Sequence, residues 1–353
     1  MKPRLVDWLL LAFVPAETAT GLLSFLEGRP EGRLLFALHG ALGLGILLLL
    51  AWKLLRVYPR LVGRRFGDRA TAVSVAALLL VLLTLGSGVA WTAWQWPLGY
   101  PNGLNWHVIF GLALTPAAVA HMALRFKPLR RADLQGRRAA LRFVAVLTAG
   151  GALWLAQNGA AAVARLPGAR RRFTGSYEVG SSQGLAFPVT MWMLDRPAPV
   201  DPAAWQVRVG GAVARPLALS VHELASMPQA AVQAVLDCTG GWYTEQVWRG
   251  VRAGDLLDAV QPQPDAVAVS FVSVTGYRWS LPLAEARAAL LATHVERWGE
   301  ATALDHGRGA PLRLVAPGRR GFQWVKWIER IEVLTARDAG QWAAIFTSGL
   351  DGM

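Results

Sequence analysis

The sequence predicts two parts of different fold class: a membrane bundle of five α-helices and, after it, an α+β domain. Long apolar runs dominate up to about residue 165, and the short alternating patterns of an ordinary mixed domain follow. The chain has one cysteine, Cys238, and it lies in the second part. These observations divide the sequence into residues 1–165, residues 166–335 and a tail of residues 336–353.

Five apolar stretches are long enough to cross a bilayer, which takes roughly 20 residues. Runs such as Leu42–Ala51 and Val73–Leu85 have almost no polar face, which argues against buried helices of a soluble core. The predicted spans are Leu5–Phe25, Leu34–Leu55, Ala72–Trp94, Asn105–Phe126 and Ala140–Ala164.

The basic residues predict how these spans are oriented. Much of the net charge of +13 lies in two loops, Lys53–Arg69 and Arg125–Arg138. Cytoplasmic loops carry the excess of Lys and Arg, so both loops and the N-terminus are predicted to be cytoplasmic. Five spans in the inner membrane then leave the second part on the outer, periplasmic face. Charge confined to loops also indicates contact with membrane lipid and argues against a nucleic-acid partner.

The fifth span begins with Arg137 and Arg138 and continues through a weakly apolar stretch. This pattern resembles a twin-arginine export signal placed inside the chain. A plain cytoplasmic flank is the alternative.

Three histidines, His39, His107 and His121, lie within the predicted spans. Ionisable residues in a membrane mark function by default, and neutral imidazole is a haem ligand. The separation of His107 and His121 is close to four helical turns, so they share a face. His39 lies at the depth of His107, so His39 and His107 are the preferred pair for haem b iron. His39 with His121, and structural hydrogen bonds, remain alternatives. The histidine left over by either pair would serve a second haem, a quinone or a hydrogen bond.

Other membrane residues allow two interpretations each. Glycines 40, 43 and 45, and glycines 86 and 88, either let a macrocycle approach or mark tight helix packing. Glu17 either belongs to a proton or quinone path or sits in a polar crevice without a role.

Alternation and capping signals predict the elements of the second part. The predicted strands are Gln206–Val209, Ala234–Leu236, Ala266–Val274, Pro311–Ala316 and Val325–Leu334, and the predicted helices start after Ser220 and cover Ala253–Val260 and Leu283–His294. His222 and His294 are predicted on surface helices, with structural roles.

Cys238 lies between an apolar strand and the turn Gly240-Gly241. One cysteine forms no internal disulfide, so any chemistry it has depends on its thiolate. An inert, buried thiol is an equally good interpretation of this local sequence.

Two sequence blocks carry a family resemblance. The first is Leu-Asp-Cys-Thr-Gly-Gly-Trp-Tyr-Thr-Glu-Gln-Val-Trp-Arg-Gly-Val, residues 236–251, and the second joins Gly309–Pro317 to Gly321–Ile328. Together they resemble the molybdenum-ligand and pterin-phosphate segments of sulfite oxidase-type molybdopterin oxidoreductases, over about residues 173–335.

The resemblance implies that a strand delivers Cys238 to molybdenum and that a Trp-x-Gly-Val turn at Trp248 leads into a helix. It implies that Arg313 and Lys326 clamp the pterin phosphate, since both are cations suited to it. Arg308 occupies a position where relatives carry asparagine or histidine. The remaining implied cofactor contacts are Phe187, Thr190, Ser273, Thr275 and Gln323, with Tyr243 as a catalytic candidate in the pocket. Further candidates are Trp242, His306, and Arg319 with Arg320, the last two being interpreted equally as an exposed basic turn.

The plan is similar to that of the bacterial periplasmic methionine sulfoxide reductase system, in which a haem-b membrane protein supplies a catalytic subunit of this type. It implies oxygen-atom transfer to or from a small-molecule substrate, with electrons exchanged with quinone through haem b. Reduction of an S-oxide is the preferred direction. A sulfite-type dehydrogenase and a non-enzymatic membrane sensor or scaffold are the alternatives.

Overall fold

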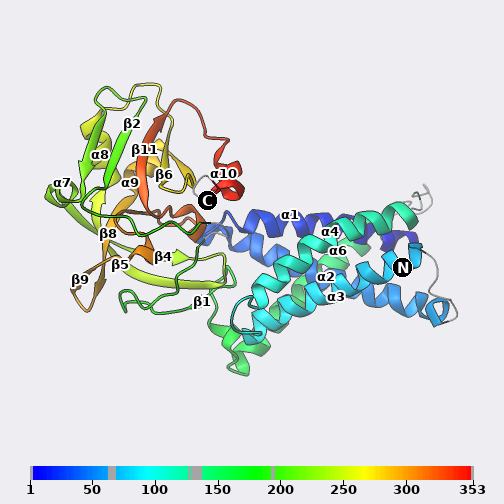
Figure 1. The fold of residues 1–353 in the computed structure, drawn as a ribbon. Coiled ribbons are helices and arrows are strands. Elements are labelled where there is room, and N and C mark those ends of the chain that lie inside the picture. The colour runs from blue at the N-terminus through cyan, green and yellow to red at the C-terminus, as the bar shows by residue number, and fades with distance from the viewer. Residues whose placement is uncertain (1–2, 63–68, 126–127, 129–136, 192–194, 351–353) are drawn as a thin grey trace. The chain divides into compact units, whose positions relative to one another are not determined.

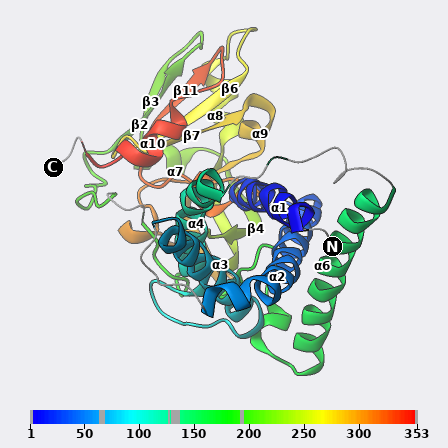
Figure 2. The same cartoon turned by 90° about the vertical axis from the view of Figure 1, so that its right-hand side faces the viewer.

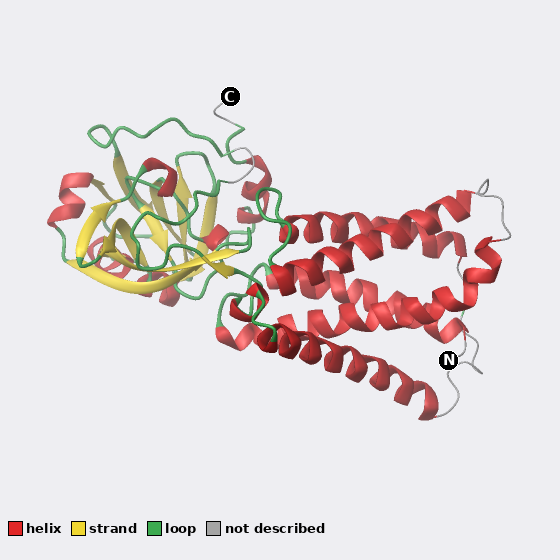
Figure 3. Ribbon diagram, turned by 90° about the horizontal axis from the view of Figure 1, so that it is seen from below, coloured by secondary structure: helices red, strands yellow, loops and turns green. Residues whose placement is uncertain are grey.

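The computed structural model describes residues 3–62, 69–125, 128, 137–191 and 195–350. It divides into two compact units, Met1–Tyr177 and Glu178–Met353, which we call the helical unit and the sheet unit (Figure 3). The division falls later than the boundary expected at residues 165 and 166. Residues up to Tyr177 join the helical unit because the Trp91 indole donates to the Gly175 carbonyl (2.9 Å) and the Tyr177 hydroxyl donates to the Trp91 carbonyl (2.5 Å).

Five helices in the described part of the helical unit are long and apolar enough to cross a membrane, and they cover the five predicted apolar stretches (Figure 1). Each helix matches its predicted span within a few residues, except that α2 runs on past Leu55. They are α1 (Pro3–Ser24), α2 (Arg33–Val62), α3 (Arg69–Trp94), α4 (Gly103–Arg125) and α6 (Arg137–Val163), with the short 3-10 turns η1 (Pro30–Gly32) and η2 (Pro167–Arg170).

Small residues allow the helices to approach closely. Helix α2 packs against α1 on one side and α6 on another, and α3 packs against α4 (Figure 2). At Gly150 of α6 a Cβ atom would lie 2.2 Å from the Ala41 carbonyl oxygen of α2. The contact therefore requires glycine, as is common between membrane helices.

Several of the basic residues that predict the orientation of the spans lie outside the described residues. Arg64 and Arg65, and Lys127, Arg130 and Arg131, lie outside the described residues. The side chains of Arg137 and Arg138 are also outside them, so the export signal stays a prediction.

The sheet unit is built on two sheets. In the first, the order is β5-β8-β10, with β4 also paired to β5 and β9 to β8, and these pairs are antiparallel. In the second, the order is β3-β2-β11-β6-β7, where only the β2–β11 pair is parallel. The two-residue strand β1 (Tyr177–Glu178) lies at the boundary between the units. The other elements are β2 (Gln206–Gly211), β3 (Leu217–Ser220), α7 (Val221–Ser226), β4 (Gln229–Asp237), β5 (Trp242–Arg252), α8 (Ala253–Val260), β6 (Ala268–Ser273), β7 (Arg278–Pro282), α9 (Leu283–Ala288), β8 (Leu290–Arg297), β9 (Glu300–Ala303), η3 (His306–Arg308), β10 (Arg313–Val315), η4 (Gly321–Gln323), β11 (Ile328–Leu334) and α10 (Gln341–Thr347).

The sheet unit confirms most predicted elements. All five predicted strands are present, the helix Ala253–Val260 has the predicted bounds, and Ser220 forms a capping box with Glu223. His222 lies exposed on α7 as predicted.

Two local predictions were wrong. The helix expected up to His294 ends at Ala288, and His294 lies in strand β8. The segment expected to turn at Trp248 is the end of strand β5, bent by a register shift between Arg249 and Gly250.

The predicted tail, residues 336–353, contains helix α10, whose Trp342 packs edge-on against Trp279 at 5.1 Å.

We predict that Gly250→Ala destabilises the sheet unit by about 1–3 kcal/mol, the usual cost of overpacking. A Cβ atom at Gly250 would lie 2.0 Å from the Leu291 carbonyl oxygen, which is backbone and cannot rotate away. The matched control is Gly210→Ala, where no atom lies within 4 Å of the added carbon. We expect that control to change stability by about 0.5 kcal/mol or less. Chemical denaturation followed by tryptophan fluorescence measures both, and equal losses would contradict the prediction.

Candidate functional site

Cys238 directly follows strand β4 and is held in a tight turn. Its amide donates to the Trp242 carbonyl (2.9 Å), and the Gly240 amide donates to its Sγ (3.3 Å). A Cβ atom at Gly321 would lie 3.1 Å from the Cys238 Cα, so η4 also approaches the turn closely. The thiol is buried, with 7% of the residue exposed. Burial raises the pKa of the thiol, while the Gly240 amide, Thr190 and Arg320 oppose that shift.

Arg320 is the residue that the sequence placed least well. It is 3% exposed, and its Nη1 lies 3.4 Å from Oδ1 of Asp237, the residue before the cysteine. Its Nη2 donates to the Cys238 carbonyl (3.4 Å). The exposed-turn interpretation is therefore wrong for Arg320, because a parallel bridge between Asp237 and Arg320 brings the turn against β4. Arg319 instead pairs with Glu285 through two bonds of 2.6 Å.

Three cations gather near the cysteine, and main-chain carbonyl groups orient them. Arg313 is 3% exposed, lies over the rings of Trp248 and Trp324, and donates to the Arg308 carbonyl (3.0 Å). Lys326 donates to the carbonyls of Thr190 (2.8 Å) and Gly307 (2.7 Å). Carbonyl groups fix the direction of a cation without cancelling its charge.

Arg308 completes this group, which we call the cation cluster: Arg308, Arg313 and Lys326. Its Nη2 donates to the Phe187 carbonyl (2.6 Å), and its guanidinium lies over the Phe187 ring. It also pairs with the Asp305 carboxylate at 2.5 Å. The position that departs from the family pattern thus still supplies a cation to the site.

The electrostatics of the cation cluster indicate an anionic ligand. Burial, and then the neighbouring Arg313 charge, lower the pKa of Lys326 to about 7. Burial lowers the pKa of Arg313 to about 10. The buried Nε atoms of Arg308 and Arg313 have no hydrogen-bond partner in the described structure. Buried donors of this kind require an acceptor, which an oxyanion such as a phosphate provides.

An aromatic wall borders the cysteine and the cation cluster. The Phe187 ring lies 6.1 Å from that of Trp242 and 5.8 Å from that of Trp248. The Trp242 indole donates to the Thr190 hydroxyl (3.2 Å), and Thr190 also interacts with the Cys238 thiol. The structure therefore brings Phe187 and Thr190 to the site, as the resemblance implied.

The remaining predicted cofactor contacts, Ser273, Thr275 and Gln323, make hydrogen bonds within the sheet unit. Thr275 donates to the Ser273 hydroxyl (3.1 Å) and bonds Asp195, a buried carboxyl that sequence reasoning missed. Burial raises the pKa of Asp195, which Lys326 opposes. Gln323 is fully buried and accepts from the Arg320 amide (2.9 Å), so it shapes the turn.

Two further predicted site residues, Tyr243 and His306, contact other residues of the sheet unit. Tyr243 lies opposite Asp237 in the β4–β5 ladder, one position from the cysteine. His306 stacks on Trp327 at 5.2 Å, and its Nε2 contacts the Pro197 carbonyl (3.1 Å). Neither contact defines a role toward a ligand.

The donor set decides what kind of metal centre the site can hold. Across the described residues, no group of three or more His, Cys, Asp and Glu side chains could hold a metal ion. Cys238 can thus supply one soft thiolate, and a cofactor must supply the other ligands of a thiophilic metal. The unpartnered arginine nitrogens fit the charged end of such a cofactor.

Two histidines of the helical unit, His39 and His107, lie close together, and His121 lies close to four helical turns further along α4. The rings of His39 and His107 lie 5.9 Å apart, edge to face. Nδ1 of His107 contacts the Thr84 carbonyl (2.8 Å), a bond that leaves Nε2 for a metal. Nδ1 of His39 contacts the Thr20 hydroxyl (3.1 Å), and its Nε2 lies 3.4 Å from Oε1 of Glu17.

The glycines near these histidines face protein side chains. A Cβ atom at Gly40 would meet the Trp154 ring at 2.2 Å, and one at Gly88 would meet His107 Nδ1 at 2.9 Å. Glycines 43 and 45 similarly face Glu17 and Phe13, whereas Gly86 faces open space. Close packing therefore accounts for four of these five glycines.

Comparisons with known proteins agree with the chemistry of the sheet unit. The family model described as oxidoreductase molybdopterin binding domain matches residues 194–342. The protein-methionine-sulfoxide reductase catalytic subunit MsrP of Gluconobacter oxydans (strain 621H) is 30% identical over 184 residues, 47% of this chain and 56% of that protein. This chain thus spans about half the length of that relative.

Two further proteins are similar to this chain. The uncharacterized oxidoreductase YuiH of Bacillus subtilis (strain 168) is 28% identical over 158 residues, 44% of this chain and 78% of that protein. The solved sulfane dehydrogenase SoxCD of Paracoccus pantotrophus covers 39% of this chain and 40% of its own, with 21% identity and a TM-score of 0.37.

We predict that without a bound anion the stability of the sheet unit depends on the titration of Lys326. The folded-state pKa of about 7 lies below the unfolded value of roughly 10.4. The unfolded chain therefore binds more protons between about pH 7 and pH 10, and the free energy of unfolding rises with pH in that window. Below about pH 7 the slope from this group disappears.

Denaturation of cofactor-free protein at several pH values, with Lys326→Met as the comparison, measures this slope. Because the two proteins share their other titrating groups, the difference between their free energies of unfolding isolates the contribution of Lys326. Parallel stability curves from pH 7 to pH 10 would show that Lys326 does not titrate there.

Proposed function

We propose that this chain, whose residues 194–342 form a molybdopterin-binding oxidoreductase domain of the sulfite oxidase type, is a membrane-anchored molybdenum enzyme that reduces an S-oxide. The observation that carries the proposal is one buried thiol, Cys238, beside a cation cluster with unpartnered arginine nitrogens. A metal held by a single thiolate and an anionic organic cofactor needs this combination.

Each part of the site has a role toward the cofactor. Cys238 would be the protein ligand of molybdenum, and Arg308, Arg313 and Lys326 would hold the pterin phosphate. The bound cofactor supplies two-electron oxygen-atom transfer. Arg320 donates to the Cys238 carbonyl and so orients the turn that presents the thiolate. Phe187 and Trp242 form an apolar wall that excludes water, which strengthens the electrostatic interactions inside.

The direction of reaction is supported by the similarity to a methionine sulfoxide reductase subunit. Reduction of an S-oxide takes up two protons and two electrons and releases water and a thioether. The reverse type of reaction, oxidation of sulfite with water to sulfate, releases two protons and two electrons. It remains the alternative because the family described for residues 194–342 is an oxidoreductase domain without a stated direction.

The helical unit would supply these electrons through haem b. The support is the pair His39 and His107, whose rings lie 5.9 Å apart between apolar helices. Nε2 of His107 is left available by its bond to Thr84, whereas Nε2 of His39 must turn from Glu17 to bind iron. Quinone in the membrane is the proposed electron partner, and His121 is not assigned to this haem.

The proposed setting is the inner membrane, with the N-terminus cytoplasmic and the sheet unit on the periplasmic face. Five apolar helices are compatible with this anchoring, and the basic loops of the sequence support the orientation. The non-enzymatic sensor is the disfavoured rival, because it gives no reason to bury arginine Nε atoms without a hydrogen-bond partner beside a thiol.

We predict that Cys238→Ser abolishes turnover while the haem is retained. Loss of a metal ligand should exceed the about 10–100-fold typical of losing an outer-shell partner. The assay is methionine sulfoxide reduction by a reduced viologen, with molybdenum content and the haem spectrum measured in parallel. Sulfite with ferricyanide is the assay for the alternative direction. Unchanged activity in Cys238→Ser, or no molybdenum in the wild-type protein, would refute the proposal.

We predict that His39→Ala and His107→Ala each lose the b-type Soret band, because either change leaves the iron with one protein ligand. His121→Ala should keep the band, and His222→Ala, exposed on α7, is the control outside the membrane helices. A normal spectrum in His107→Ala excludes that residue as a ligand. A band lost only with His39 and His121 would select the alternative pair.

A further inference from the structure

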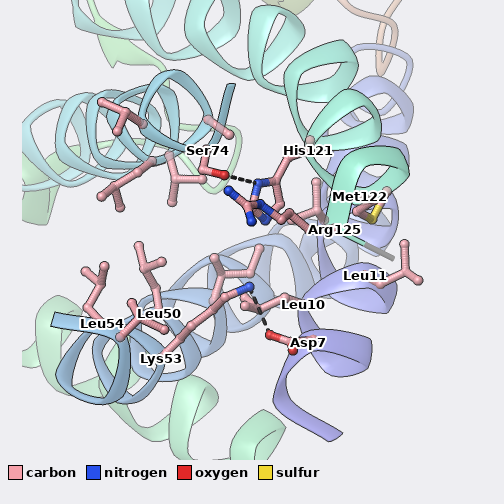
Figure 4. A pocket seen from close by; sticks show the side chains of 18 of the residues that line it. Asp7, Leu10, Leu11, Leu50, Lys53, Leu54, Ser74, His121, Met122 and Arg125 are labelled. Carbon is pink, nitrogen blue, oxygen red and sulfur yellow. Dashed lines mark hydrogen bonds and ion pairs between the residues drawn. The ribbon is translucent and has the colours of Figure 1, made fainter. Parts of the chain in front are cut away.

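We propose that a cavity at one end of the helical unit binds the head group of a quinone. The cavity has a volume of about 620 Å³ and is bounded by α1, α2, α3 and α4 (Figure 4). This size lies within the range of roughly 300–1,000 Å³ typical of small-molecule sites. The choice of a quinone as the ligand rests on the proposed function, whereas the presence of the cavity does not depend on it.

The cavity has separate polar and apolar parts. Its polar groups gather where α1 and α3 begin and α2 and α4 end, and its apolar side chains continue from there along the helices. The polar lining comprises Asp7, Lys53, Arg56, Thr71, Ser74, His121 and Arg125. An amphiphile with a polar ring and an apolar tail matches this division.

The polar groups suit a ring that carries two carbonyl oxygens. Nδ1 of His121 contacts the Ser74 hydroxyl (3.0 Å), which leaves Nε2 for a ligand. Arg125 donates to Thr71 (3.3 Å) and places its guanidinium in the cavity lining. Figure 4 shows His121 and Arg125 side by side on the same cavity wall. Quinone oxygens accept such bonds, and an imidazole can exchange the proton that a quinone gains on reduction.

The spacing of residues along α2 and α4 argues against a second bis-histidine haem in this cavity. On α4 the chain runs close to four turns from His107 to His121, and on α2 the same interval separates His39 from Lys53. The cavity level therefore repeats the histidine level, with a lysine in place of one imidazole. Lys53 is tied to Asp7 at 2.9 Å, so it is engaged as an ammonium group.

The chemistry of this site would be Q + 2e⁻ + 2H⁺ ⇌ QH₂. The electrons would be exchanged one at a time with the haem b of the proposed function, and the protons would pass through the polar groups at the end of the bundle. Over both reactions, one S-oxide and one quinol would give one thioether, one quinone and one water.

The test uses full-length protein in detergent and decylubiquinone, with binding measured by equilibrium titration and by thermal stabilisation. Ala118→Phe places a ring in the cavity, and its matched control is Ala120→Phe, which is exposed on the same helix outside the lining. We expect Ala118→Phe to weaken binding by at least about 10-fold and Ala120→Phe to leave it unchanged. His121→Leu removes one hydrogen bond and should weaken binding by about 2–10-fold.

The outcomes separate this inference from the proposed function. Quinone binding that is lost in Ala118→Phe supports the site even if the protein holds no haem or molybdenum. Binding that is absent, or equal in Ala118→Phe and Ala120→Phe, overturns the site even if viologen-driven S-oxide reduction is intact. Equal protection by phosphatidylglycerol and by quinone, both lost in Ala118→Phe, would assign the cavity to lipid and also overturn it.

Discussion

The sheet unit depends on positive charge that it gathers beside one buried thiol and holds largely by main-chain carbonyl groups. Arg313 and Lys326 are held by main-chain carbonyl groups, which orient the charges and leave their sum intact. Burying these charges is costly, and the lowered pKa values of both groups express that cost, which the Cys238 thiol opposes at both groups and Asp305 at Lys326. A fold keeps such an arrangement when an anion completes it. An anion bound to the cation cluster would stabilise the sheet unit by its binding free energy.

The same constraint explains how two distant sequence blocks become one site. Strand β4 brings Cys238 to the end of a hairpin, and the bridge from Asp237 to Arg320 brings the second block against it. Gly321 permits this approach, since a side chain there would crowd the Cys238 backbone. The aromatic rings of Trp248 and Trp324 then cover the Arg313 guanidinium. The positions of the glycines and tryptophans in both motifs therefore follow from the need to bury cations near a thiol.

Sequence patterns could predict the elements because these depend on local periodicity, and the five spans and five strands illustrate this. They could also place Arg313, Lys326 and Phe187, since a family resemblance ties these residues to a ligand. Arg320 and Asp195 could not be found in this way. Arg320 is buried by a bridge to a strand far from it in the sequence, and Asp195 is marked only by its bond to Thr275. Similarly, the family resemblance implied a turn at Trp248, and pairing with β8 makes this segment part of a strand.

In the helical unit, helices α2 and α4 each carry two polar residues at the same spacing. The same interval along the helix leads from His39 to Lys53 on α2 and from His107 to His121 on α4. It is close to four turns, which brings each residue back to the same face, so both pairs point between the same helices. At the first level, two imidazoles meet at 5.9 Å, close enough to share one metal. At the second level, Asp7 engages Lys53, and the space between the helices opens into a cavity. The two ends of this spacing therefore differ in one residue: an imidazole faces His107 at the first level, and Lys53, paired with Asp7, lines the cavity with His121 at the second.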